Sequence, residues 1–289
     1  GWLVELVSED GIIGWGDCAP LPSTGEASGA QVQWALETAL IDIEARRRDI
    51  PLAILLGAAS LSVPVNAALG SLDEGCAERA IAAASQGFAI AKIKVGLLGI
   101  DEELARLRAV AGAVGGRLRL RLDANRAWNE ANARRFLSAI GDLPGVCVDG
   151  VEEPLAAPAL AALARLQAAV PFALAVDESL ARLGAGALFA SRAVRRLVLK
   201  PARIGGVLRT LALALLAQAA GMEVVLTSVV DSAIGVAAAA HLAAAIAPDT
   251  AHGLATGGWL AEDVAPALPI REGRLVLPGS PGLGIAPLL

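Results

Sequence analysis

From about residue 63 onward, short apolar segments alternate with longer, alanine-rich segments whose apolar positions recur every three or four residues. The short segments are typical of buried parallel strands, and the longer ones are typical of amphipathic helices. We expect strands at 63–69, 90–96, 117–123, 146–152, 172–177, 195–200, 223–228 and 251–254. We expect helices to begin near Asp73, Asp101, Asn129, Pro158, Ser179, Gly206 and Ser232. Eight strands separated by seven helices predict an α/β fold, a (β/α)7β TIM-like barrel.

The two ends of the chain have a different pattern. Residues 1–17 alternate around a Glu9-Asp10-Gly11 turn, as in a β-hairpin, and a helical pattern follows from about 30 to 48. We therefore expect a small α+β capping domain at 1–60, the barrel at 61–257, and a tail at 258–289 that returns to the capping domain through a strand at 273–277. Because Gly1 already lies inside an alternating pattern, we expect a further strand segment before it.

Composition changes this picture little. The chain is 55% hydrophobic, but its most apolar stretch, 210–230, contains Gly221 and Glu223, which favours a helix, a turn and a buried strand over a membrane span. A net charge of −5 argues against a nucleic-acid partner. The three cysteines have no metal-site or disulfide spacing, so we expect a reducing, cytoplasmic location. A homo-oligomer is left open.

Charged residues gather where the predicted strands end. Lys92 and Lys94 are two positions apart, so both should face the same side of their strand. Along the next strand, leucines alternate with a polar series made of Arg117, Arg119, Arg121, Asp123 and Asn125. The following three strands end in Glu152-Glu153, Asp177-Glu178 and Lys200. Active sites of α/β barrels form at the C-terminal ends of the strands, so the pattern predicts a site there.

Three carboxylates from adjacent strand ends would form a crowded negative site. One interpretation is a structural network of ion pairs with Lys92 and Lys94. The other, which we favour, is a metal site, because a hard divalent cation would relieve the repulsion, and ligands that are all oxygen suit Mg²⁺ or Mn²⁺. His241 lies within a helical pattern and is expected to be a helix residue and not a ligand. His252 lies near the end of the eighth predicted strand, where a structural role in the loop and a catalytic role are both left open.

The succession Lys-x-Lys, Asp-x-Asn, Glu-Glu-Pro, Asp-Glu-Ser and Lys-Pro resembles the muconate-lactonizing-enzyme branch of the enolase superfamily over nearly the whole chain. The resemblance implies that Asp123, Glu152 and Asp177 bind the metal. It also implies that Lys94 and Lys200 lie on opposite faces of a small carboxylate substrate. Lys92 would orient the substrate and favour the neutral, proton-accepting form of Lys94 by like-charge repulsion.

Within this branch, three features resemble the o-succinylbenzoate synthases: the segment 14–22 with Glu26 beyond it, Arg121, and the segment 251–257. This resemblance implies a hydro-lyase of menaquinone biosynthesis. Its reaction is the syn dehydration of 2-succinyl-6-hydroxy-2,4-cyclohexadiene-1-carboxylate through α-proton abstraction and a metal-stabilised enediolate. Two alternatives stay open, an N-succinylamino acid racemase or dipeptide epimerase of the same branch, and an inactive barrel with a binding or structural role. The residues expected to bind substrate are Arg121, Asn125, Thr227, Ser228, Gly253, Pro20 and Leu21.

Overall fold

The computed structural model describes residues 1–20 and 27–288. The chain forms two compact units. Unit 1 comprises Gly1–Val65, Leu199–Leu215 and Val224–Leu289, and unit 2 comprises Asn66–Val198 and Leu216–Glu223.

Unit 2 is built on a curled parallel sheet, which makes the fold α/β. The strands of the sheet are β4 (Ala67–Ser71), β5 (Ile90–Lys94), β6 (Arg119–Asp123), β7 (Val148–Glu152), β8 (Ala173–Val176), β9 (Arg196–Leu199) and β10 (Glu223–Leu226), of which Leu199 and all of β10 except Glu223 belong to unit 1. They lie in the order β10-β9-β8-β7-β6-β5-β4, so neighbours in the sequence are neighbours in the sheet. The connecting helices of unit 2 are α3 (Cys76–Ser85), α4 (Ile100–Val114), α5 (Glu130–Gly141), α6 (Leu160–Ala168), α7 (Leu180–Leu183) and α8 (Ala185–Ser191).

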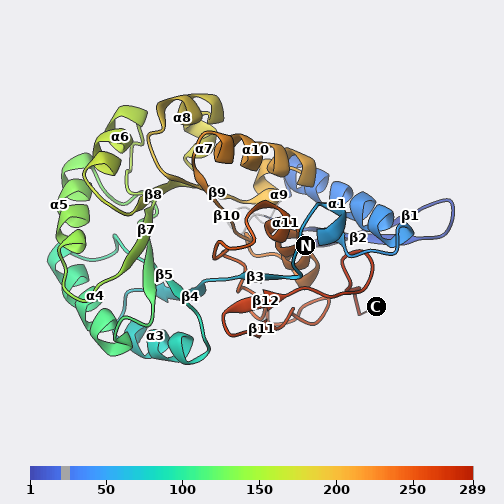
Figure 1. The fold of residues 1–289 in the computed structure, drawn as a ribbon, viewed down its shortest axis with the longest axis horizontal. Helices are drawn as coiled ribbons and strands as arrows, with labels where there is room; N and C mark the ends of the chain where they lie inside the picture. The colour runs from blue at the N-terminus through green and yellow to red at the C-terminus, as the bar shows by residue number, and fades with distance from the viewer. Residues whose placement is uncertain (21–26, 289) are drawn as a thin grey trace. The chain divides into compact units, whose positions relative to one another are not determined.

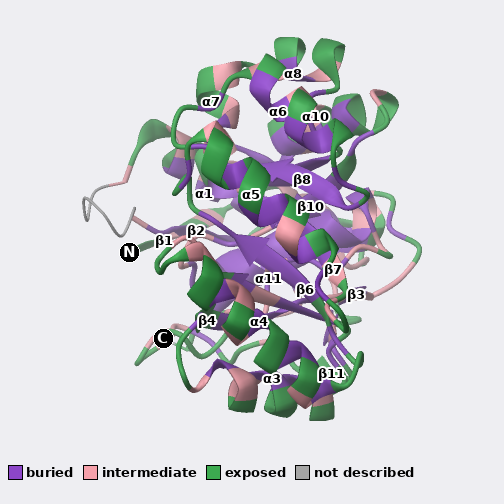
Figure 2. Cartoon of the chain, turned by 90° about the vertical axis from the view of Figure 1, so that its left-hand side faces the viewer, coloured by how far each residue is buried: buried purple, intermediate pink, exposed green. Residues whose placement is uncertain are grey.

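The helices of unit 2 lie along the outer side of the curled sheet (Figure 1). Figure 2 shows buried strands behind helices whose outward faces are exposed. The leucines that alternate in β6 and directly before it agree with this layering: Leu118, Leu120 and Leu122 are each 2% exposed or less. The polar residues between them therefore point to the opposite face, as the alternation predicted.

Unit 1 contains the two ends of the chain. Its elements are β1 (Trp2–Val7), β2 (Ile13–Cys18), α1 (Gly29–Arg47), α2 (Leu52–Leu55), β3 (Ser62–Pro64), α9 (Pro201–Ile204), most of α10 (Val207–Ala219), most of β10, α11 (Ala233–Ile246), β11 (Ile270–Arg271) and β12 (Arg274–Val276). Strands β1 and β2 form the predicted antiparallel hairpin. Two glycines of β2 let α1 pack directly on it, because a Cβ on Gly14 or Gly16 would lie about 2 Å from a carbonyl oxygen of α1.

Two predicted strands differ from the structure. The segment 63–69 is divided, because β3 pairs with the antiparallel strand β12 of the tail, and only β4 joins the parallel sheet. The segment 251–254 forms no continuous strand. Instead, His252 bridges Val65 and Gly253 bridges Thr227, each in parallel orientation. The segment thus makes one bridge on each side, which is too short a ladder for a strand.

The apolar stretch at 210–230 is a helix, a turn and a strand, as expected: α10 ends at Ala219 and β10 begins at Glu223. Within residues 1–20 and 27–288, no helix is both long and apolar enough to cross a membrane.

Both histidines bind backbone groups, which agrees with the helix position expected of His241 and favours the structural role of His252. His241 is fully buried in α11, where its Nδ1 accepts from the Ala53 amide at 3.0 Å and its Nε2 lies 3.1 Å from the Leu283 carbonyl. Burial lowers the pKa of His241 to about 4, so the ring is neutral at pH 7. His252 accepts a hydrogen bond from the Leu226 amide and pairs with the Ala247 carbonyl.

A buried carboxyl group with an unusual pKa, that of Asp231, lies just before α11. Burial, followed by the charge of Asp17, raises the pKa of Asp231 to about 7. The native state therefore holds a proton that the unfolded chain, with a pKa near 3.8, has released. Between these two values, stability falls as pH rises, because the native state binds more protons than the unfolded state.

We expect Asp231→Asn to remove this dependence. The free energy of unfolding of the wild type should fall by about 2–3 kcal/mol between pH 5 and 7 through this group, at 1.36 kcal/mol per unit. The asparagine variant should lack this slope and keep the hydrogen bond from the Val229 amide. Urea denaturation at several pH values measures the slope, with the exposed Asp249→Asn as the matched control. Equal slopes in the wild type and Asp231→Asn would contradict the prediction.

Candidate active site

Three of the predicted site residues lie side by side at the C-terminal ends of neighbouring strands. Lys94 is in register with Asp123, and Asp123 is in register with Glu152. Glu152 is in register with Ala175 on β8, so Asp177 lies two residues beyond this level. Asp123, Glu152 and Asp177 are buried, and the Lys94 side chain is exposed.

Lys92 joins two of these carboxylates. Its Nζ lies 2.5 Å from Oε2 of Glu152 and 2.9 Å from Oδ2 of Asp123. Burial alone would lower the pKa of Lys92, but the charges of Glu152 and Asp123 outweigh it and hold the pKa above its usual value. Lys92 is therefore a fixed cation shared by both acids.

Glu153 links the end of β7 to the segment that follows β8. It has a left-handed backbone (φ 47°), which turns its side chain away from the strand pattern. Its Oε1 accepts from the Asp177 amide at 2.7 Å and from the Ser179 amide at 2.9 Å. Glu153 thus fixes the backbone that carries Asp177. Burial raises the pKa of Glu153 against the effect of these hydrogen bonds.

The residues present fit a hard divalent cation. Lys92 shows that one carboxylate oxygen of Asp123 and one of Glu152 converge on a single positive charge. Mg²⁺ in enzymes is commonly held by one or two carboxylates, with water and substrate completing its shell. Among the residues that the structure describes, no three His, Cys, Asp or Glu side chains form a complete metal cage. The fit to a divalent cation therefore rests on the two convergent carboxylates, those of Asp123 and Glu152.

Asn125, a predicted substrate contact, follows the site on an unusual backbone. Asn125 and Arg126 have φ values of 43° and 65°, in the left-handed region. The Asn125 amide donates to Oδ1 of Asp123 at 3.0 Å, which fixes that carboxylate, and the Asn125 side chain is exposed.

Arg121 lies one layer below, at the level of Lys92. It is 1% exposed, its Nε donates to Oδ2 of Asp149 at 2.8 Å, and its Nη1 donates to Oδ1 of Asn66 at 3.1 Å. Arg196 reaches the same Asp149 oxygen at 2.7 Å. Burial raises the pKa of Asp149, but the charges of Arg121 and Arg196 outweigh it, so the pKa lies below its ordinary value.

A break in the strand register brings Asp149 into this layer. The register between β6 and β7 shifts by one residue between the pairs Leu120–Val148 and Arg121–Gly150. Such a bulge redirects the side chain of the extra residue, here Asp149. Gly150 beside it leaves room for an arginine, because a Cβ there would lie 2.6 Å from Nη1 of Arg196. The layer beneath the site is thus a set of arginines around one buried carboxylate.

The remaining predicted residues lie in unit 1. Lys200 directly follows β9 and is the N-cap residue of α9. Thr227, Ser228 and Gly253 come together: the Thr227 hydroxyl donates to the Gly253 carbonyl at 3.0 Å, and the Ser228 hydroxyl pairs with Thr256 at 2.9 Å. The Thr227 proton is therefore engaged by the backbone. Pro20 follows β2 and is partly exposed, and Leu21 lies outside the described residues, as does Glu26.

Sequence reasoning did not find Asn66, Asp149 or Arg196. Strict alternation along β7 places Asp149 on the same face as Val151, and only the bulge reverses this. The distribution of lysine along the chain is a separate signal, and it marks the candidate active site. The chain contains only three, Lys92, Lys94 and Lys200, and every other strongly basic side chain is an arginine.

Comparison with known proteins identifies the family. Residues 75–288 match the family described as enolase C-terminal domain-like. A chloromuconate cycloisomerase from Cupriavidus pinatubonensis is 33% identical over 267 residues, which cover 90% of this chain and 70% of that protein. A hydrophobic dipeptide epimerase from Enterococcus faecalis is 28% identical over 283 residues, which cover 84% and 78%.

Solved structures agree in fold. A dipeptide epimerase from Enterococcus faecalis superposes with a TM-score of 0.88 at 27% identity, covering 98% of this chain and 93% of the other. A muconate cycloisomerase from Pseudomonas fluorescens gives a TM-score of 0.84 at 26% identity, covering 99% and 91%. These neighbours have a TIM-like α/β fold, which the curled parallel sheet shares.

Proposed function

The chain belongs to the enolase superfamily, in its muconate-lactonizing-enzyme branch, and from this premise we propose that it is an o-succinylbenzoate synthase. The reaction proposed is the Mg²⁺-dependent syn dehydration of 2-succinyl-6-hydroxy-2,4-cyclohexadiene-1-carboxylate to 2-succinylbenzoate, a cytoplasmic step of menaquinone biosynthesis.

One observation carries the proposal: Lys94, Asp123 and Glu152 are adjacent in register at the C-terminal strand ends, with Lys92 bridging the two acids. An exposed amine thus lies beside two convergent carboxylates, which is what removal of a proton next to a metal-bound carboxylate needs. The restriction of lysine to these positions supports the same chemistry. Lysine can lose its proton and act as a base, and arginine cannot.

In the proposed mechanism, Asp123, Glu152 and Asp177 would hold Mg²⁺, or Mn²⁺ in its place. The metal, when bound, supplies positive charge that stabilises the enediolate of the substrate. Lys94 takes the proton α to the carboxylate and then returns it to the departing hydroxyl group, so that water leaves from the same face. Lys200 stabilises the developing negative charge from the other face, and Lys92 keeps the carboxylates of Asp123 and Glu152 in place.

Substrate choice is assigned to residues around this centre. We propose that 1–60 and 258–289 form a capping domain beside a (β/α)7β barrel at 61–257, and that Pro20 and Leu21 contribute to selection. Gly253 and Ser228 would face the succinyl group. Arg121 is assigned a positioning role, because Asp149 and Asn66 engage its guanidinium beneath Lys92.

The second candidate is a racemase or dipeptide epimerase. The dipeptide epimerases among the relatives favour it, and a lysine on each face of the substrate suits both reactions. In that case Lys200 would serve as the second acid and base and not as a stabilising cation.

Turnover separates the two. Purified protein with 5–10 mM Mg²⁺, on the order of ordinary assay conditions for this weakly held ion, is expected to consume the cyclohexadiene substrate, followed by its loss of absorbance. EDTA should stop the reaction and Mg²⁺ should restore it. If no turnover occurs, N-succinylamino acids and dipeptides are tested for α-proton exchange in deuterated water. Proton exchange without dehydration would favour the racemase or epimerase over the synthase. Absence of both dehydration and proton exchange would favour an inactive barrel.

A further inference from the structure

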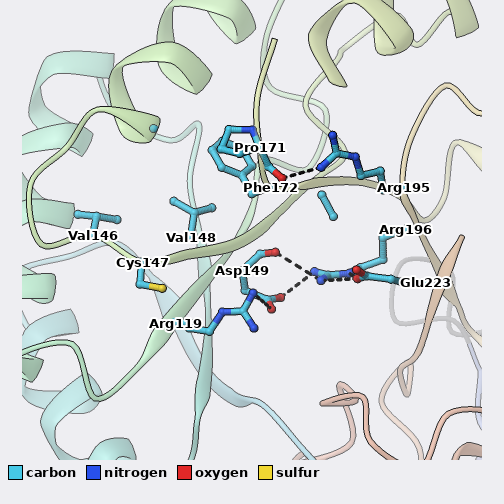
Figure 3. Close-up of a pocket in the computed structure, with 12 residues that line it drawn as sticks. Arg119, Val146, Cys147, Val148, Asp149, Pro171, Phe172, Arg195, Arg196 and Glu223 are labelled. Atoms are coloured by element: carbon cyan, nitrogen blue, oxygen red, sulfur yellow. Dashed lines mark hydrogen bonds and ion pairs between the residues drawn. The ribbon is translucent and has the colours of Figure 1, made fainter. Parts of the chain in front are cut away.

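A cavity of about 400 Å³ lies within unit 2 where the parallel strands begin (Figure 3). Arg119 is the first residue of β6 and lines this cavity, and Asp123 ends the same strand at the candidate active site. Four residues of strand separate them, about 13 Å at 3.3 Å per residue. The cavity is therefore a different place from the candidate active site.

Positive charge exceeds negative charge around this cavity. Its charged lining consists of Arg119, Arg195 and Arg196 against Asp149 and Glu223. Arg196 takes most of the negative charge, since its guanidinium contacts Asp149 and Glu223, each at 2.7 Å. Asp149 is further shared with Arg121, which lies beneath. The charge of Arg119 and Arg195 is thus left largely uncompensated, on a chain whose net charge is −5.

Arg119 and Arg195 also retain hydrogen-bond donors. Arg119 contacts Asp149 at 3.2 Å with a side chain that is 52% exposed. Arg195 donates through Nη1 to the Pro171 carbonyl at 2.6 Å, and among residues 1–20 and 27–288 no carboxylate forms a salt bridge with it. A guanidinium carries five N–H groups, so both can bind a further acceptor. In Figure 3, Arg119 and Arg196 approach Asp149 from opposite sides, and Arg195 points to the Pro171 carbonyl.

Most of the remaining lining residues are apolar. Val146, Val148, Pro171 and Phe172 contribute to the cavity wall. Guanidinium groups bind carboxylate and phosphate through paired hydrogen bonds, and an apolar wall accepts a hydrocarbon body. We propose that this cavity binds a small organic oxyanion, a carboxylate or phosphate group on a compact apolar body, through Arg119 and Arg195.

Cys147 provides a local reporter for this site. It lines the cavity and is exposed, and the other two cysteines, Cys18 and Cys76, are buried. A ligand in the cavity should therefore slow alkylation of Cys147 by iodoacetamide, and a ligand bound elsewhere should not. The probes are benzoate and phenyl phosphate, with benzyl alcohol as the uncharged analogue.

The expected result is that benzoate or phenyl phosphate protects Cys147 and benzyl alcohol does not. Whichever anion protects at the lower concentration identifies the carboxylate or the phosphate as the preferred group. In the double variant Arg119→Gln/Arg195→Gln, protection should need roughly 100-fold more ligand, about tenfold for each charge-assisted contact. The matched control is Arg165→Gln, an exposed arginine of α6 that is paired with Glu130, and it should behave as the wild type.

Three outcomes would overturn the proposal. One is a Cys147 alkylation rate that neither anion changes in folded protein. Another is equal protection by benzyl alcohol, which would mean that the cavity binds apolar molecules without using its arginines. The third is full protection in the double variant. None of these readouts depends on turnover, so the proposed synthase activity can fail while this site stands.

Discussion

Replacing Lys94 with alanine is expected to lower kcat for the proposed dehydration by about 10³-fold, within the range for loss of a general base. Lys94 is exposed and adjacent in register to Asp123, so its removal leaves no buried group unpaired and the fold should persist. Steady-state turnover with saturating Mg²⁺ measures the loss, and thermal unfolding checks that the protein remains folded.

Lys94→Arg sharpens this prediction. Arginine keeps the positive charge but cannot be deprotonated at working pH. If Lys94 acts as a base, arginine should be nearly as inactive as alanine. If Lys94 only attracts the substrate carboxylate, arginine should retain most of the activity and alanine should mainly raise KM. Retained turnover in Lys94→Arg would therefore remove Lys94 from the proton-transfer role.

The second large effect concerns stability. We expect Asp149→Asn to lower the free energy of unfolding by about 3–5 kcal/mol, because it leaves buried guanidinium charge without its counter-charge. Asp149 is 3% exposed and receives Arg121 and Arg196, which are also buried. Asparagine has nearly the same volume, so the loss reports charge and not packing.

Urea denaturation at pH 7 measures this change. Asp142→Asn, an exposed substitution at the end of α5, is the matched control and should shift stability by less than about 0.5 kcal/mol. A loss below about 1 kcal/mol for Asp149→Asn would mean that Arg121 and Arg196 are compensated in another way, by Glu223 and Asn66. The buried layer would then not depend on one carboxylate.

Much of the fold follows from local patterns in the sequence. Most of the parallel strands are short and contain alternating or continuous apolar residues, and most of the intervening helices have an apolar stripe. Chain order equals sheet order, so no long-range choice had to be predicted. The two differences, at 63–69 and 251–254, arise where a segment meets partners from distant parts of the chain. Strand β12 of the tail pairs with β3, and residues 252 and 253 each make a single bridge. The local sequence of each segment does not encode these distant partners.

The candidate site divides in the same way. The sequence by itself determined that Lys94, Asp123 and Glu152 end neighbouring strands, because parallel strands of similar length bring their C-terminal ends to one level. Only the tertiary structure decided that Lys92 is bound by both acids, and that Asp149 turns inward to meet Arg121. The physical reason is that a side-chain ion pair depends on distances across strands. A one-residue bulge, which leaves no mark on the local hydrophobic pattern, is enough to reverse the face on which a charge lies.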